Sequence, residues 1–213
     1  MPVACGLLKS RSKPRSVHKA LFHNLHPHGQ DLIRSWAQRG IAKADEHRPA
    51  SDFEAFIYLW IALNGWGACV ANTDNDTEWV NALAVDPNIS KTFQKLLDDD
   101  QGFRQTGEAF AARWPIFKAS EIRRQQILVS PDQSRPERIR DYLTRRISCE
   151  PKCWKDHGGR PPLDWPHTLA SLYRVRNNLF HGEKTLDSVN DRAIVAAACS
   201  VLALFVQKGE LFR

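Results

Sequence analysis

Two long apolar segments constrain the fold of this 213-residue chain more than any other feature. The first, DFEAFIYLWIALNGWGACVA over 52–71, is apolar on nearly every side when drawn as a helix, which is typical of a buried central helix. The second, AIVAAACSVLALFV over 193–206, forms the body of a last helix. No segment alternates apolar and polar residues as a half-buried strand does. The sequence therefore predicts an all-α protein.

Capping signals place the helix ends. Ser51, followed by Glu54, has the spacing of a capping box and predicts the start of the first apolar helix. Asp76 or Thr77 is the expected cap of the helix EWVNALA. Two shorter amphipathic helices are expected at SKTFQKLLDDD and GFRQTGEAFAARW.

Glycine and proline mark the ends of the last two helices. Pro166 suits a first helical turn, and the helix that it opens is expected to run to His181 and stop at Gly182. The last helix is expected to begin at Ser188 or Asn190 and to end at Gly209.

Charge is spread unevenly along the chain, which we interpret as one domain over 1–213. Residues 1–48, expected to be a basic helical segment, carry nine Lys/Arg and three Asp/Glu. Residues 49–112 carry three Lys/Arg and ten Asp/Glu, and residues 113–160 carry twelve Lys/Arg and six Asp/Glu. Residues 113–165 are interpreted as a basic, partly irregular insertion with one helix at about 134–147. Two basic segments around an acidic one indicate either a polyanion-binding face or ordinary solvated charge.

The cysteine count and the apolar segments bear on cellular location. Five cysteines, an odd number with two inside apolar helices, argue against a disulfide framework and favour a reducing cytoplasm. The first 15 residues lack a secretory signal, and the apolar stretches at 55–71 and 193–206 fall short of a clean membrane span. We therefore expect a cytoplasmic protein without a membrane partner.

The segment YRVRNNLFHGEK, 173–184, concentrates chemically active side chains near the end of one helix. At about 100° per residue, Arg174, Asn177, Asn178 and His181 form one polar stripe. Arg176 falls on the apolar side, where a guanidinium needs an anionic partner. Either a structural ion pair or a cleft formed by a partner chain would provide one.

RNNLFH, 176–181, resembles the Arg-x4–6-His signature of HEPN domains (higher eukaryote and prokaryote nucleotide-binding), and the context of 50–72 and 166–208 is similar to that family. The resemblance implies a dimeric helical bundle that acts as a metal-independent endoribonuclease, often a toxin or phage-defence effector with an antitoxin or defence-system partner. Arg176 and His181 would be catalytic, and Asn177 would support them. Arg174, which is separated from the histidine by six residues, and Asn178 are further candidates for supporting roles.

The chemistry is consistent with that activity. A histidine can transfer protons near neutral pH, and an arginine can stabilise phosphate charge. Attack by the RNA 2′-hydroxyl would leave a 2′,3′-cyclic phosphate and a 5′-hydroxyl. The segment GEKTLD after the histidine lacks the Tyr-x-Tyr pair that a nucleotidyltransferase antitoxin modifies in some members. The alternatives are a non-catalytic nucleotide-binding, RNA-binding or scaffold module, and, more weakly, a DNA-binding helical protein.

Other clusters give weaker indications. The predicted insertion helix carries four arginines that would bind RNA phosphates, with Tyr142 nearby for stacking, unless they are simply a solvated face: Arg138, Arg140, Arg145 and Arg146. A histidine-rich segment and a Cys-x3-Cys-x3-His segment lack the spacing or the fourth ligand of a metal site: His18, His23, His26 and His28, and Cys149, Cys153 and His157. The sequence predicts neither a metal site nor a cofactor.

Overall fold

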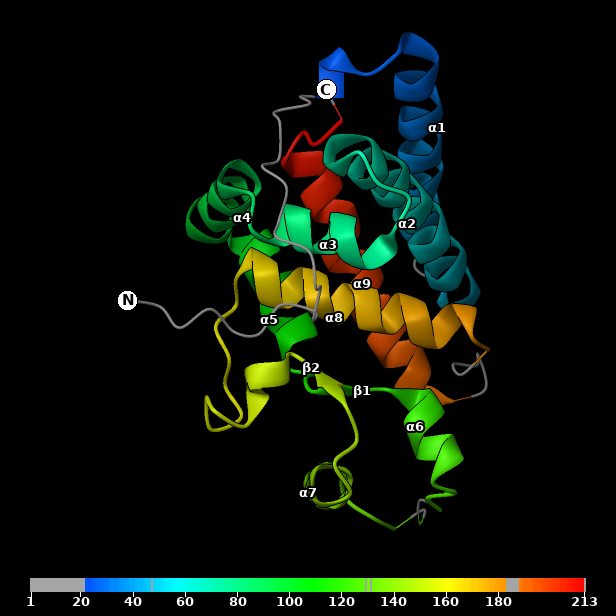
Figure 1. Ribbon diagram of the computed structural model, residues 1–213, viewed down its shortest axis with the longest axis vertical. Coiled ribbons are helices and arrows are strands. Elements are labelled where there is room, and N and C mark those ends of the chain that lie inside the picture. Colours follow the sequence, from blue (N-terminus) through cyan, green and yellow to red (C-terminus); the bar gives the residue numbers. More distant parts are fainter. Residues whose placement is uncertain (1–21, 47, 129, 131, 183–187, 213) are drawn as a thin grey trace.

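The computed structural model describes residues 22–46, 48–128, 130, 132–182 and 188–212, and in these residues the chain is all-α, as predicted (Figure 1). One two-stranded ladder interrupts the helices. The elements in chain order are α1 (Pro27–Ala44), α2 (Pro49–Ala71), α3 (Asp76–Ala84), α4 (Pro87–Asp99), α5 (Gln101–Ala111), β1 (Ile116–Phe117), α6 (Ala119–Arg124), α7 (Arg135–Thr144), β2 (Cys149–Glu150), α8 (Trp165–Phe180) and α9 (Val189–Lys208), with 3₁₀ turns at Phe22–Asn24 and Lys152–Trp154.

The predicted ends of α8 and α9 are confirmed, whereas two predicted N-terminal caps are wrong. Gly182 follows the end of α8 with a φ of +67°, and Ser188 caps α9 by accepting a hydrogen bond from the Asp191 N–H. Helix α2 begins earlier than expected, at Pro49, because proline fits the first helical turn. Ser51 therefore lies inside the helix and donates a hydrogen bond to the Glu46 carboxylate. The cap of α3 is Asn75, one residue before the predicted site.

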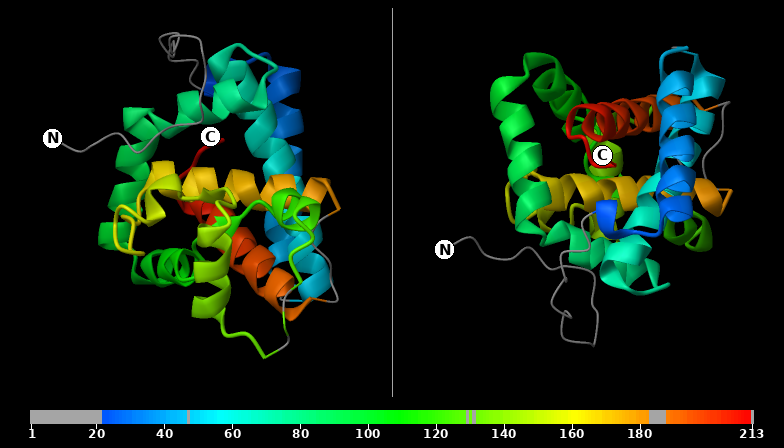
Figure 2. Two further views of the ribbon diagram at one scale, coloured as in Figure 1. Left: turned by 60° about the horizontal axis from the view of Figure 1, so that its bottom comes forward. Right: turned by 90° about the horizontal axis from the view of Figure 1, so that it is seen from above.

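Helix α2 runs through the core, as its apolar sequence predicts. It packs against α1, α3 and α9, and Ala55, Phe56 and Leu59 have no exposed surface. Gly67 allows α3 to approach closely, because a Cβ at this position would lie 2.5 Å from the Trp79 ring. Figure 2 shows α8 crossing the bundle at a large angle to α2. Helix α8 is therefore held from the sides while its C-terminal end reaches the molecular surface.

The beginning of α8 is anchored by aromatic packing. Trp165 is 1% exposed, and its ring lies 4.7 Å from that of Phe205 in α9 and 5.8 Å from that of Phe93 in α4. Its indole N–H donates a 2.8 Å hydrogen bond to the Leu83 carbonyl. This cluster fixes the position from which the rest of α8 extends.

The insertion is more structured than its sequence indicates. Strands β1 and β2 pair in antiparallel register, Ile116 with Glu150, and α6 and α7 lie beyond them at one end of the molecule (Figure 1). The sequence predicted no strand and a single helix at about 134–147, so the ladder and α6 are corrections, and α7 stops at Thr144. Two-residue strands are too short to show a periodic pattern. Helix α7 has no buried residue, so it is the least enclosed of the longer helices.

Helices α2 and α9 are both long and apolar enough to cross a membrane, which corrects the expectation that they fall short. Both contribute many residues to the core. The core helix of a soluble protein has the same length and composition, so this property is weak evidence for a membrane.

Candidate active site at the exposed end of helix α8

The polar residues near the end of α8 separate into three pairs, each spaced by four residues. Residues four apart lie on the same face of a helix. Arg174 and Asn178 bond to the insertion, Arg176 pairs with Asp76 of α3 and lies over the Phe180 ring, and Asn177 and His181 form the third pair. The single polar stripe predicted from the sequence is therefore divided, because the insertion covers one edge of it.

Asn178 attaches the insertion to α8. It is 2% exposed, its amide nitrogen donates to the Phe117 carbonyl at 2.8 Å, and its amide oxygen accepts from the Ala119 N–H at 3.2 Å. Both backbone groups belong to the junction between β1 and α6. Asn178 therefore holds the insertion against α8 through two hydrogen bonds. The expected role of Asn178 in supporting catalysis stays a prediction.

Arg174 makes a second attachment to the insertion. Its guanidinium lies 3.6 Å from the Glu150 carboxylate of β2, and the two side chains are 12% and 5% exposed. Burial raises the pKa of Glu150, while the nearby charges of Lys152 and Arg174 act in the opposite direction. Arg174 thus faces away from the solvent-exposed pair, toward a carboxylate that needs its charge.

Arg176 has an ion-pair partner within its own chain. Its Nη1 lies 3.0 Å from the Asp76 carboxylate at the start of α3 and donates a 2.9 Å hydrogen bond to the Asn177 side chain. Its guanidinium also lies over the Phe180 ring, 4.8 Å from the centroid. Of the two partners that the sequence left open for Arg176, the structural ion pair is therefore present within the chain, while the Arg176 Nε is buried without a hydrogen-bond partner among the described residues. Among the described residues Nη2 has no hydrogen-bond partner, so this nitrogen can still bind an anion.

In the third pair His181 is exposed and Asn177 is half-buried. His181 is the exposed C-terminal cap of α8, and its backbone N–H donates to the Asn177 carbonyl at 3.1 Å. Two apolar side chains near it are also exposed, Phe180 at 50% and Val189 at 71%. The end of α8 therefore presents an exposed imidazole, and the residue before it, Phe180, lies under the Arg176 guanidinium.

We expect Asn178→Ala to loosen the insertion without unfolding the bundle. The substitution removes both side-chain bonds and leaves a buried carbonyl and N–H unpaired, which costs about 1–3 kcal/mol. Hydrogen exchange should rise at residues 116–125 and change little in α2. Asn178→Asp, which retains the acceptor for Ala119, is the matched variant and should give a smaller increase in exchange at Ala119. Equal exchange in wild type and Asn178→Ala would contradict this role.

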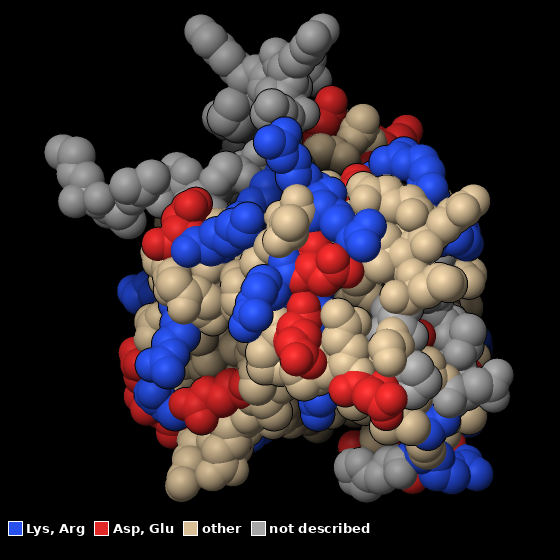
Figure 3. Space-filling view, turned by 90° about the horizontal axis from the view of Figure 1, so that it is seen from below, with Lys and Arg blue, Asp and Glu red and all other residues tan. Residues whose placement is uncertain are grey.

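The four insertion arginines expected to bind RNA occupy different settings. Arg145 is paired with Asp141 at 2.9 Å, Arg140 and Arg146 are exposed, and Arg138 lines a pocket between the insertion and the bundle. Figure 3, which views the molecule from the insertion end, shows Lys and Arg interspersed with Asp and Glu. This face therefore carries charges of both signs, and an anion would be bound by a local group of arginines and not by the overall charge of the face.

The candidate metal clusters are not assembled in the part of the chain that the structure describes, where no group of three His, Cys, Asp or Glu could hold a metal ion. His18 lies outside that part. Cys153 instead lies 3.1 Å from His167, whose other ring nitrogen lies 2.5 Å from Asp164. Cys153 is disulfide-bonded, which the argument against a disulfide framework did not predict, and its sulfur cannot act as a nucleophile in this state. Cys69, Cys149 and Cys199 are free.

Comparisons with known protein families, curated proteins and solved structures found no match to this chain. The functional argument therefore depends on the RNNLFH segment and on the geometry of the site.

Proposed function

We propose that this chain is a metal-independent endoribonuclease of HEPN type, acting as a homodimer. The supporting observation is the end of α8, where exposed His181 and half-buried Asn177 are four residues apart on one helix face and the Arg176 guanidinium donates to the Asn177 side chain. These are the three residues of the Arg-Asn-x3-His pattern, 176–181. Their arrangement supplies a proton-transfer group and a phosphate-binding group at one surface.

The proposed reaction uses the nucleophile that RNA itself carries. One His181 removes the proton of the 2′-hydroxyl, and the resulting oxygen attacks the adjacent phosphorus. Arg176 donates to the phosphate oxygens, on which negative charge increases. A second imidazole gives a proton to the 5′-oxygen as its bond to phosphorus breaks. The products are a 2′,3′-cyclic phosphate and a 5′-hydroxyl, and no metal takes part.

A second copy of the chain would provide that second imidazole. A two-fold axis near the end of α8 would place two copies of His181 in one groove. The exposed Phe180 and Val189 side chains would be covered by such an interface. Light scattering at the concentrations used for the activity assay tests the dimer directly, and a monomer that cleaves RNA would contradict this part of the proposal.

The activity is tested by incubating the purified protein with RNA in the presence of a chelator. Cleavage should persist, and the downstream fragments should accept a labelled phosphate from a polynucleotide kinase without prior dephosphorylation, because their 5′ ends are hydroxyls. Fragments with 5′-phosphate ends, or cleavage that stops when metal is removed, would contradict the mechanism.

A binding or scaffold module is the second candidate function. It is favoured by the two ion pairs Arg174–Glu150 and Arg176–Asp76, which give both arginines a structural partner. A module of this kind would bind without cleaving, and His181→Ala would change neither binding nor oligomeric state.

A further inference from the structure

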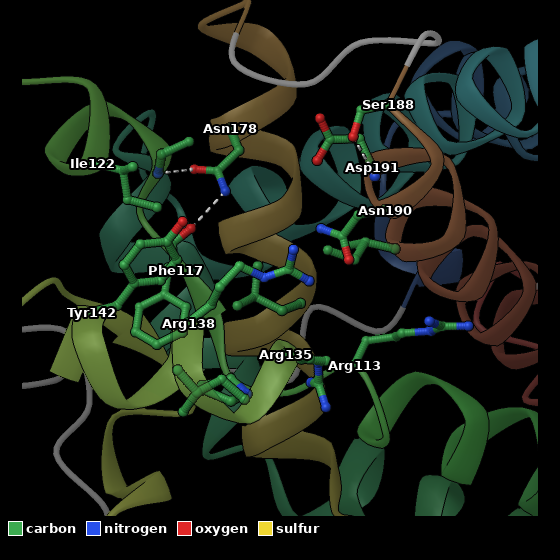
Figure 4. Close-up of a pocket in the computed structure, with 15 residues that line it drawn as sticks. Arg113, Phe117, Ile122, Arg135, Arg138, Tyr142, Asn178, Ser188, Asn190 and Asp191 are labelled. Carbon is green, nitrogen blue, oxygen red and sulfur yellow. Dashed lines mark hydrogen bonds between the residues drawn. The ribbon is translucent and has the colours of Figure 1, made fainter. Parts of the chain in front are cut away.

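A pocket with a volume of about 380 Å³ lies between the insertion and the bundle (Figure 4). The insertion provides one wall from β1, α6 and α7. The other wall comes from Asn178 in α8 and from the first turn of α9, with its cap Ser188. The volume is in the range of sites for small molecules.

The three arginines that line this pocket outnumber its carboxylates. Arg113, Arg135 and Arg138 have no ion pair among the described residues, and Arg135 donates a hydrogen bond to the Trp114 carbonyl at 2.6 Å. Partial burial lowers the pKa of Arg135, and the neighbouring charges of Arg113 and Arg138 lower it further. Three like charges at one place raise the free energy of the empty pocket, and an anion bound among them would remove that repulsion.

The remaining lining restricts the kind of anion. Figure 4 shows Arg138 reaching from α7 toward Asn190 on the opposite wall, where Ser188 and Asn190 add polar groups. Asp191 contributes the single carboxylate among the lining residues, against three guanidinium groups. Several isoleucines and the Tyr142 ring, which is packed edge-on against Phe117 at 4.9 Å, line the rest. A ligand that fits has a multiply charged head and a flat, largely apolar body.

We propose that this pocket binds one nucleotide, with its phosphate between Arg113, Arg135 and Arg138 and its base against the apolar wall near Tyr142. Guanidinium groups match phosphate oxygens in geometry and charge, and an aromatic side chain is the usual contact of a base. The nucleotide is either free or one residue of a single-stranded RNA. The proposal goes beyond the RNA-cutting activity and does not depend on it, because binding is measured without cleavage.

Bound nucleotide would also join the insertion to the bundle. Helix α7 has no buried residue, and Arg138 reaches from it toward the beginning of α9 across the pocket. A phosphate bonded to both sides would reduce the motion of α7, and a ligand that binds only the folded state raises the melting temperature.

The test measures binding of four probes to the full chain by calorimetry and melting temperature: adenosine 5′-monophosphate, adenosine, inorganic phosphate, and a deoxy-modified pentanucleotide RNA that cannot be cleaved. The monophosphate should bind and raise the melting temperature, phosphate should bind more weakly, and adenosine should have no measurable effect. Tighter binding of the pentanucleotide than of the monophosphate identifies an RNA residue as the ligand. Equal or weaker binding identifies the free nucleotide.

A matched pair of variants on α7 tests the site itself. Arg138→Ala should weaken binding of the preferred probe about 10-fold or more, because it removes a charge-assisted hydrogen bond. Arg140→Ala removes the same charge from an exposed position outside the pocket, so the affinity for adenosine 5′-monophosphate should change less than about 2-fold. Arg113→Ala, at an exposed position at the end of α5, should repeat the Arg138→Ala result from a different segment.

Two outcomes would overturn the proposal. If neither the monophosphate nor the pentanucleotide binds the folded wild-type chain, the pocket is not a nucleotide site. If Arg138→Ala and Arg140→Ala weaken binding equally, the affinity comes from general surface charge. His181 lies outside the pocket, so loss of cleavage in His181→Ala and loss of monophosphate binding in Arg138→Ala are separate results.

Discussion

We expect His181→Ala to reduce RNA cleavage by about 10²–10⁴-fold, the usual contribution of one general acid–base group. In a symmetric dimer each chain would contribute the same imidazole, so the single substitution removes both the base and the acid. The side chain is exposed at the end of α8, and the helix cap uses the backbone N–H, which alanine retains. The initial rate of cleavage of a labelled RNA, with chelator present, measures the effect.

His28→Ala is the matched control, because this exposed histidine lies on α1, away from α8. It should cleave RNA as wild type does, and both variants should retain the wild-type circular dichroism and melting temperature. If His181→Ala cleaves as fast as wild type and both samples are pure, His181 is not catalytic. If His28→Ala loses the same activity, the measured cleavage depends on something other than the α8 site.

The helical framework could be predicted from the sequence because its signals are local. The near-continuous apolar body of α2 predicts burial wherever the helix is placed, and Gly182 and Ser188 mark boundaries through their own backbone chemistry. The cap of α2 was misplaced because Ser51 and Glu54 match a capping box in sequence, while Pro49 starts the helix two residues earlier. Two valid local signals competed, and the sequence alone does not rank them.

The division of the α8 polar stripe could not be predicted in the same way. Helical periodicity gives the direction of Arg174 and Asn178 relative to Asn177, but which direction is covered depends on where the insertion lies. The covering groups, the Phe117 carbonyl and Glu150, come from residues that are 61 and 24 positions away from their partners. The pairing of Arg176 with Asp76 is nonlocal for the same reason.

The arginine pocket was only partly predictable. The sequence predicts that Arg138 binds RNA, because it belongs to a basic helix. Arg113 and Arg135 are not among the four arginines for which the sequence predicts RNA binding. The pocket exists because the end of α5, the first turn of α7 and the first turn of α9 meet, and no sequence pattern connects these segments. The count of lysine and arginine along the chain indicates the region but not which three arginines line the pocket.

Arg176→Lys should reduce RNA cleavage by about 10²–10³-fold while the chain stays folded. Lysine keeps a positive charge near Asp76, but it lacks the planar fork that donates to two phosphate oxygens at once. Loss of one donor that stabilises developing charge has an effect of this size in other enzymes. Because the substitution preserves the sign of the charge, circular dichroism should be unchanged, and the effect should be found in the rate of the chemical step under single-turnover conditions.

Asp76→Asn tests whether the role of Arg176 is catalytic or structural. It removes the ion pair with Arg176 but keeps a side-chain oxygen that can accept the hydrogen bond from the Trp79 indole. If Arg176 acts on the phosphate, Asp76→Asn leaves the guanidinium in place and cleavage stays within a few-fold of wild type. If Arg176 serves only to hold α3 against α8, both Asp76→Asn and Arg176→Lys should lower the free energy of unfolding. The rate of cleavage should then fall in both variants in proportion to the loss of folded protein. Equal loss of cleavage in the two variants would therefore assign Arg176 to the fold and leave His181 without its phosphate-binding partner.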